Sequence, residues 1–263
     1  MWNINRRAKA LLGIVLYRTA LHRAFWKQRA LIVVFHRVDD RFPADPLSRS
    51  VQEFRAYCEF FQRHFVVVSL GELLEKLQAG RDISRHLVIT FDDGYRDNRT
   101  VAAVELRRRN LPACFFVTTG YVGSSENAWW DSYREVTTEW MSWDDVRALR
   151  EQGFELGLHT MHHVDLGVVA GEQAVEEIVD SKACMEREIG GEAAHFCYPF
   201  GRPWQMSEEN RALVRAAGYR CCLSAYGGTV RPGDDAYRLK RTALDTWYTS
   251  PYQFGFEVAW RRS

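Results

Sequence analysis

Short apolar runs recur along the chain and alternate with stretches of helical periodicity. The runs are nearly continuous in apolar residues, a pattern typical of parallel strands that are buried on both faces. We expect strands at residues 31–35, 65–69, 87–91, 114–117, 154–158, 195–198, 219–223 and 238–243. Between them, Phe54, Tyr57, Cys58 and Phe61 share one helical face, and further helices are expected at 143–152, 172–189, 207–217 and 251–260. This alternation predicts a parallel α/β architecture.

The overall composition is that of a globular chain with a full core, but the charge is unevenly distributed. Residues 1–38 contain eight Lys and Arg and no acid, which leaves about −7 for the remainder (27 Lys and Arg against 34 Asp and Glu). The basic segment 1–29 is expected to be helical and to touch an anionic membrane peripherally, or else to pack on the body. Its apolar stretch, residues 10–17, is too short to span a bilayer. No nucleic-acid partner is expected.

The six cysteines show no paired spacing. Most of them lie in apolar strand-like runs, where a free cysteine behaves as a small hydrophobic residue. This usage indicates a reducing compartment. We therefore expect a cytoplasmic protein, with peripheral attachment to the inner face of the membrane as an extension of that expectation.

Two motifs carry candidate chemistry at the ends of predicted strands. Thr90-Phe91-Asp92-Asp93-Gly94 follows an apolar run, and His159-Thr160-Met161-His162-His163 follows another. One aspartate with two histidines can hold a divalent ion and keep positions open for water and substrate. The second aspartate, left off the metal, can take a proton from that water.

The two motifs, together with Tyr198-Pro199-Phe200-Gly201, resemble those of the polysaccharide deacetylases of the NodB-homology type, carbohydrate esterase family 4. The resemblance covers roughly residues 30–245 and implies a distorted (β/α)7-type barrel of parallel strands. It divides the chain into the basic segment 1–29 and a catalytic domain, 30–263. It implies Asp93, His159 and His163 as metal ligands and Asp92 as the base. The expected ion is Zn²⁺, with Co²⁺, Ni²⁺ or Mn²⁺ as alternatives.

The chain departs from the family pattern in two places. Many members have Arg-x-Pro-Tyr where this chain has Cys197-Tyr198-Pro199-Phe200, so the arginine that braces the base is missing. We expect Arg238 or Arg241 to supply the charge. We group Arg241 with Tyr198, Pro199, Phe200 and Asp245 around the oxyanion and the substrate.

The family's late Leu-x-His motif, which supplies a general acid, is also missing. His36 follows the first predicted strand, as in a circularly permuted branch of the family, and is expected to be the acid. Asp245 resembles the element that orients the catalytic histidine. The backbone N–H of Phe200 is expected to polarise the scissile carbonyl.

These features predict a metal-dependent hydrolase that removes N-acetyl groups from an amino sugar in a glycan or lipid-linked saccharide and releases acetate. Three alternatives stay open: a non-haem Fe(II) oxygenase, a catalytically impaired sugar-binding protein on the same fold, and an amidase acting on a non-sugar amide. The non-periodic segment 120–140 carries Trp129, Trp130, Tyr133 and Trp140, which could stack on sugar rings or pack as core and lid.

Overall fold

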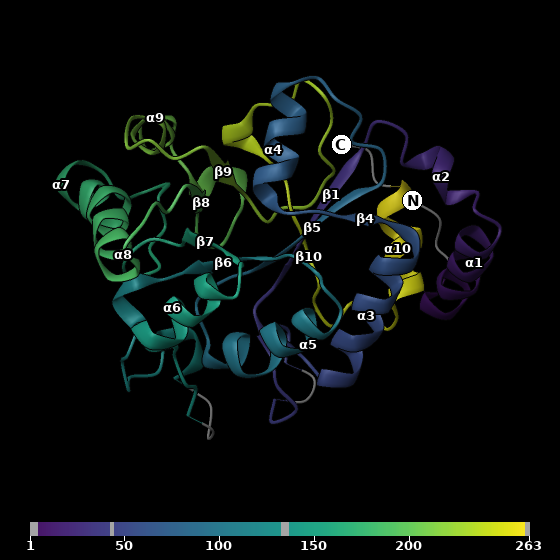
Figure 1. Cartoon of the computed structure of the whole chain (residues 1–263), viewed down its shortest axis with the longest axis horizontal. Coiled ribbons are helices and arrows are strands. Elements are labelled where there is room, and N and C mark those ends of the chain that lie inside the picture. Colours follow the sequence, from purple (N-terminus) through teal and green to yellow (C-terminus); the bar gives the residue numbers. More distant parts are fainter. Residues whose placement is uncertain (1–4, 43–44, 133–136, 261–263) are drawn as a thin grey trace.

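Eight parallel strands form one curved sheet in the computed structural model, which describes residues 5–42, 45–132 and 137–260 (Figure 1). The sheet order is β10-β1-β5-β6-β7-β8-β9, with β4 pairing beside β5. The strands are β1 Ala30–Phe35, β4 Val66–Val67, β5 His86–Phe91, β6 Cys114–Val117, β7 Glu155–Leu158, β8 His195–Cys197, β9 Cys221–Leu223 and β10 Thr242–Ala243. The β9 edge and the β10 edge of the sheet are joined only by isolated bridges, such as Leu223–Leu239 and Tyr226–Thr242, and not by a continuous ladder. This confirms the predicted distorted barrel of parallel strands.

Helices surround the sheet, and most of them lie between successive strands. They are α1 Arg6–Arg18, α2 His22–Phe25, α3 Val51–His64, α4 Leu70–Gln78, α5 Ala103–Arg108, α6 Trp143–Glu151, α7 Gly171–Val175, α8 Ser181–Ile189, α9 Glu208–Ala216 and α10 Pro251–Trp260. π-helical turns Asn98–Ala102 and Glu176–Asp180 precede α5 and join α7 to α8. A small separate sheet pairs β2 Arg37–Val38 with β3 Ser48–Arg49. Helices α4 and α5 and this small sheet were not predicted from the sequence.

Alternate residues of β1, β5, β6, β8 and β9 belong to two different cores. Leu31, Val33 and Phe35 of β1 pack in the large core under the outer helices, whereas Ile32 packs in a second core inside the barrel. The second core also takes apolar side chains from α4, among them Leu73. Burial on both faces of the strands explains why they are almost continuously apolar.

The predicted strand 238–243 is shorter than expected. Only Thr242–Ala243 forms β10, because Ala236–Arg238 turns as a short 3₁₀ helix and Leu239 makes a single bridge to Leu223. β10 pairs with β1 through Val33–Thr242 and Val34–Ala243. This register fixes Arg241 beside the carboxyl ends of β1 and β5.

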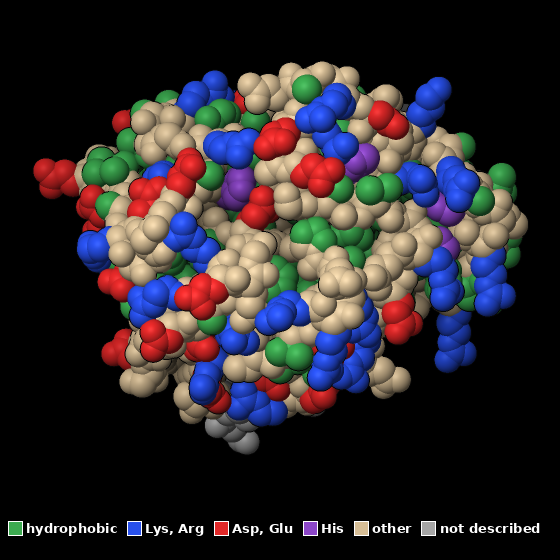
Figure 2. Space-filling model, in the orientation of Figure 1, with side chains coloured by type: hydrophobic (Ala, Val, Ile, Leu, Met, Phe, Trp, Pro, Cys, Tyr) green, Lys and Arg blue, Asp and Glu red, His purple; other side chains and the backbone are tan. Residues whose placement is uncertain are grey.

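Helices α1 and α2 lie at the right of Figure 1, and α1 packs along α10. Charges of both signs are spread over the face seen in Figure 2, but basic side chains prevail at the edge where α1 and α2 lie. No helix among the described residues is long and apolar enough to cross a membrane.

Candidate active site

The candidate site lies where several parallel strands end. Asp92 and Asp93 follow β5, His159 follows β7, and His36 follows β1. The segment from Tyr198 follows β8. Because parallel strands present their carboxyl ends at one edge of the sheet, these residues converge although they are far apart in the sequence.

Three side chains converge on one point as a divalent ion requires. Asp93 Oδ1 lies 3.4 Å from His159 Nε2 and 3.5 Å from His163 Nε2, and all three ligand atoms lie within 4.8 Å of one another. Asp93 Oδ1 is buried and has no hydrogen-bond partner among the described residues. A buried carboxylate oxygen without a partner is costly, and a cation bound by these atoms would remove that cost. The donor set therefore fits a divalent metal.

The surroundings of His159 prepare it to bind a metal. Its Nδ1 lies 2.8 Å from the carbonyl oxygen of Cys197, which can only accept a hydrogen bond, so Nδ1 carries the proton and Nε2 keeps its lone pair. Burial lowers the pKa of His159 to about 4. At neutral pH the imidazole is therefore in the neutral form that ligates metals.

The loop of the histidine motif is held by hydrogen bonds of its own. Thr160 Oγ1 accepts from the backbone N–H of His163 at 2.9 Å, so this hydroxyl orients the loop. His162 is half exposed, and its Nδ1 lies 2.8 Å from Oε1 of the buried Glu177. Glu177 Oε2 also accepts from the backbone N–H groups of Met161 and His162 at 2.9 Å each. Glu177 was missed because one glutamate on a charged helix carries no special sequence signal.

Asp92 is held by a fully buried arginine. Arg241 Nη1 donates to Asp92 Oδ1 and Nη2 donates to Oδ2, both at 2.7 Å. The side chains are 0% and 3% exposed. Burial acts to raise the pKa of Asp92, but the charge and hydrogen bonds of Arg241, together with the nearby His159 and His36, hold the pKa below its ordinary value. Asp92 is therefore an anion over the whole neutral range.

Of the two arginines expected to supply the charge next to Asp92, Arg241 does so and Arg238 does not. Arg238 lies on the surface, where it pairs with Glu208 and Asp235. The guanidinium of Arg241 also contacts Cys197 Sγ and donates from Nε to the carbonyl oxygen of Ser224. Arg241 is buried behind Asp92 and does not line the pocket, so it is not a substrate contact, in contrast to the grouping made from the sequence.

Asp92, His159 and Cys197 form a second cluster with metal-ligand spacing. Here, however, the guanidinium of Arg241 lies against both Asp92 and Cys197, and its positive charge opposes a cation at that point. Burial also raises the pKa of the Cys197 thiol, so the thiolate that metals bind is disfavoured. The Asp93 cluster is the better metal site.

A pocket of about 330 Å³ opens onto the three candidate ligands and Asp92. Its wall includes His36, Tyr198 and Phe200, together with Trp129 and Trp130. Trp129 is 64% exposed, whereas the ring of Trp130 packs 4.1 Å from that of His163. Of the aromatic residues in the non-periodic segment, Trp130 and Trp140 thus serve packing, Trp129 is available to a substrate, and Tyr133 lies outside the described residues.

The backbone around the pocket is strained. Asp93, Thr160, His163 and Phe200 all have left-handed φ values, of 74°, 65°, 56° and 61°. Each such conformation in a residue other than glycine costs about 1–3 kcal/mol, and such residues cluster at functional sites. After Phe200, Gly201 approaches another loop so closely that a Cβ would lie 2.4 Å from a backbone nitrogen. The chain is held here in a shape that local preference does not favour.

Two more of the proposed site residues, besides Arg241, lie outside the pocket. Asp245 Oδ1 accepts from the backbone N–H of Trp247 at 2.9 Å, an Asx turn after β10. Asp245 does not line the pocket that contains His36, so its expected role in orienting that histidine finds no support in the geometry. Pro199 is buried behind the pocket wall, where its carbonyl accepts from Gly201.

A buried network behind the pocket wall was not expected. Arg37 forms a paired contact with Asp131, with Nη1–Oδ2 at 2.9 Å and Nη2–Oδ1 at 3.2 Å. Tyr95 Oη donates to Asp131 at 2.8 Å and accepts from Trp130 Nε1 at 2.7 Å. The network ties the tryptophan segment to the end of β1. Its partners are separated by up to 94 positions in the sequence, so no local pattern indicates them.

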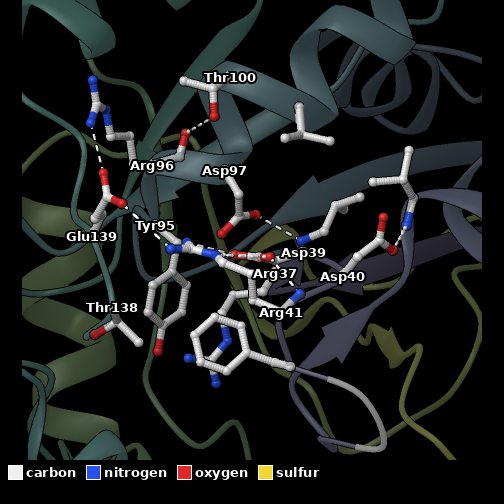
Figure 3. Close-up of a pocket in the computed structure, with 14 residues that line it drawn as sticks. Arg37, Asp39, Asp40, Arg41, Tyr95, Arg96, Asp97, Thr100, Thr138 and Glu139 are labelled. Carbon is white, nitrogen blue, oxygen red and sulfur yellow. Dashed lines mark hydrogen bonds and ion pairs between the residues drawn. The ribbon is translucent and has the colours of Figure 1, made fainter. Parts of the chain in front are cut away.

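Arg37 and Tyr95 also line a second pocket, of about 290 Å³ (Figure 3). The charges around it are mostly paired with one another, as in the 2.6 Å contact between Arg96 and Glu139. Asp97 in this wall accepts from the backbone N–H of Val38 at 2.7 Å and from Asn98 Nδ2 at 3.1 Å. Asn98 in turn donates to the carbonyl oxygen of His36 at 2.7 Å. This wall therefore fixes the backbone of His36.

Comparison with known proteins decides the family. The family model described as polysaccharide deacetylase matches residues 79–222, more than half of the chain. The chain belongs to the polysaccharide deacetylase family. The match contains both aspartates of the first motif and both candidate metal histidines, and it ends before Arg241.

Relatives of known sequence and structure agree with this assignment. The Bacillus subtilis (strain 168) protein YxkH, whose name places it among the polysaccharide deacetylases, is 24% identical over 158 residues, which are 60% of this chain and 51% of YxkH. A Geobacillus stearothermophilus protein without an assigned function is 25% identical over 156 residues, which are 57% of this chain and 51% of that protein. The chain thus spans about half the length of the curated relatives it matches.

Solved structures of other proteins share the fold. The Streptococcus pyogenes deacetylase PplD in complex with acetate superposes with a TM-score of 0.74 at 17% identity, over 89% of this chain and 99% of PplD. IcaB from Ammonifex degensii gives 0.73 at 21% identity, over 89% and 98%. These similarities show that the fold is shared, and they do not show which reaction this chain catalyses.

Proposed function

We propose that this deacetylase-family protein is a metal-dependent hydrolase that removes the N-acetyl group from an amino sugar in a glycan or lipid-linked saccharide. The reaction is hydrolysis of an acetamide: water adds to the carbonyl carbon, the C–N bond breaks, and acetate and a free amine leave. Asp93, His159 and His163 would hold the divalent ion, with Zn²⁺ the first choice and Co²⁺, Ni²⁺ or Mn²⁺ as alternatives. When bound, such an ion lowers the pKa of water and polarises a carbonyl.

Residues of the chain itself carry out proton transfer, oxyanion stabilisation and substrate binding. Asp92, ionised and fixed by Arg241, accepts the proton of the attacking water. The backbone N–H of Phe200, at the pocket wall, donates to the developing oxyanion. His36, at the carboxyl end of the neighbouring strand β1, delivers a proton to the leaving amine nitrogen. Trp129 presents an exposed aromatic face on which a sugar ring can stack.

One observation carries the proposal: a buried, braced carboxylate lies beside a convergent Asp-His-His set in the same pocket. A sugar-binding protein needs neither an ionised buried carboxylate nor a metal site, and keeping both is expensive. An oxygenase with two histidines and one carboxylate has no use for a second aspartate that is braced away from the metal.

An acetate-release assay on a panel of substrates tests the proposal. The purified chain is incubated with N-acetylated oligosaccharides, a lipid-linked N-acetyl sugar and simple non-sugar acetamides, with and without a chelator. We expect acetate from a saccharide substrate, loss of release with chelator, and recovery on adding Zn²⁺. Release from non-sugar amides alone would favour the amidase. Saccharide binding without release in the metal-loaded protein would favour the impaired binding protein, and consumption of O₂ would favour the oxygenase.

A further inference from the structure

Helix α1 uses one of its faces to pack on the body. Gly13 lies so close to α10 that a Cβ would be 2.0 Å from the carbonyl oxygen of Tyr252. Tyr17 is buried and donates to the carbonyl oxygen of Gly255, and Lys9 pairs with Glu257 at 3.2 Å. The inner face of α1 is therefore a fixed part of the fold, and α1 does not detach as a free arm.

The outer face of the same segment is apolar where a soluble surface would be polar. Leu11 is 64% exposed and Val15 is 57% exposed, one helical turn apart on α1. Leu12 is also exposed, and Leu21, in the turn between α1 and α2, is 61% exposed. Four large aliphatic side chains within eleven positions face away from the core, although the chain has buried its other helices in the usual amphipathic way.

Cations alternate with these apolar side chains. Arg7, Arg18, Arg23 and Lys27 are exposed and form no ion pair with any part of the chain that the structure describes. At helical spacing, Arg7 and Arg18 fall on the same stripe of α1 as Leu11 and Val15. No acid occurs in residues 1–38, whereas the rest of the chain is acidic. Figure 2 shows basic and hydrophobic side chains close together along the edge where α1 and α2 lie.

We propose that α1 and the α1–α2 turn form a docking surface for an anionic lipid bilayer. A helix with exposed aliphatic side chains flanked by arginines lies in the interface plane, with its apolar face among the acyl chains and its cations at the headgroups. The thirteen residues of α1 reach only about 20 Å, less than the ~30 Å hydrocarbon core, so the helix lies on the bilayer and does not cross it. The cations alone would suit a nucleic acid as well, but the aliphatic side chains between them would not.

Vesicle co-sedimentation of the full chain tests this surface and does not depend on enzymatic activity. We expect binding to vesicles of phosphatidylcholine mixed with phosphatidylglycerol, weakening as salt is raised, and no binding to phosphatidylcholine alone. The double change Arg7→Gln/Arg18→Gln should lower the partition coefficient about thirtyfold, from roughly fivefold per charge. The double change Leu11→Ser/Val15→Ser should lower it about tenfold or more.

Matched controls use exposed residues elsewhere on the chain. Arg107→Gln/Arg220→Gln removes two exposed cations, and Val168→Ser removes an aliphatic side chain that is 81% exposed. Neither should change vesicle binding. The proposal would be overturned if the chain bound neutral vesicles as well as anionic ones, or did not bind anionic vesicles at all. It would also be overturned if the control variants lost as much vesicle binding as the test variants. Binding to an oligonucleotide that Leu11→Ser/Val15→Ser leaves unchanged would also overturn it. So would a dimer in solution that Leu11→Ser/Val15→Ser abolishes, if neither protein binds vesicles.

Discussion

Replacing Arg241 tests the electrostatics of the candidate base. The guanidinium forms two 2.7 Å hydrogen bonds to Asp92 in a site from which water is almost excluded. In Arg241→Ala the burial that acts to raise the pKa of Asp92 remains, and the charge that lowers it is gone. The pKa of Asp92 should therefore rise, by about 1–3 units for the loss of one adjacent opposite charge.

The sign of the effect on activity follows from the role of the base. In the proposed role of base Asp92 must be ionised, so activity should fall as the pH drops through the pKa of this group. Raising that pKa moves the acid limb of the profile of kcat/KM against pH upward by the same 1–3 units. Within the window between the two limbs, activity should fall about tenfold per unit.

The assay is acetate release measured across pH, with melting temperature recorded for each variant. Breaking one side of a buried pair costs about 3–5 kcal/mol of stability, so Arg241→Ala should melt lower. Arg241→Lys keeps the charge without the two-pronged geometry and should give an intermediate limb. Arg238→Ala, the surface alternative, should leave the profile unchanged. An unmoved acid limb in both Arg241 variants, or an equal shift in Arg238→Ala, would show that Arg241 does not set the pKa of the catalytic group.

Three further changes test other parts of the site. Burial raises the pKa of Asp97 to about 6, so the folded state binds an extra proton below that pH and stability falls as the pH rises from about 4 to 6. Asp97→Asn should abolish this fall and add up to about 3 kcal/mol to the free energy of unfolding at pH 7, measured by denaturant titration. A stability difference between variant and parent that does not depend on pH would contradict this. Trp129→Ala should raise KM about threefold to tenfold with little change in kcat, and Trp204→Ala, equally exposed elsewhere, should not. Glu177→Gln disturbs the loop of the two metal histidines and should weaken metal binding about 10–100-fold in a calorimetric titration, whereas an unchanged affinity would show that the loop holds without it.

The sequence predicted the barrel well because strands buried on both faces carry an unambiguous apolar signal. β6 has the predicted bounds Cys114–Val117, and β1 and β5 begin one residue earlier than expected. The helix α4 was missed although Leu70, Leu73 and Leu74 have helical spacing behind the capping Ser69. Its side chains serve the interior of the barrel, a place that the simple alternation of strand and helix leaves out of account.

The site was predictable where chemistry follows strand ends, and less so where it depends on register. Asp93, His159 and His163 converge because their strands are parallel. The choice between Arg238 and Arg241 depended on where β10 pairs with β1, which composition does not determine. The contact of Arg37 in β2 with Asp131 joins two segments distant in sequence, so only the folded chain shows it.

We propose that Asp92 is the base and is not a metal ligand. Acetate release and metal content of Asp92→Asn, measured on the same sample, test this division of roles. We expect a loss of about 10²–10⁴-fold in kcat while one equivalent of metal remains bound. Normal turnover in Asp92→Asn would contradict the assignment of the base, and loss of the metal together with activity would show that Asp92 is a ligand.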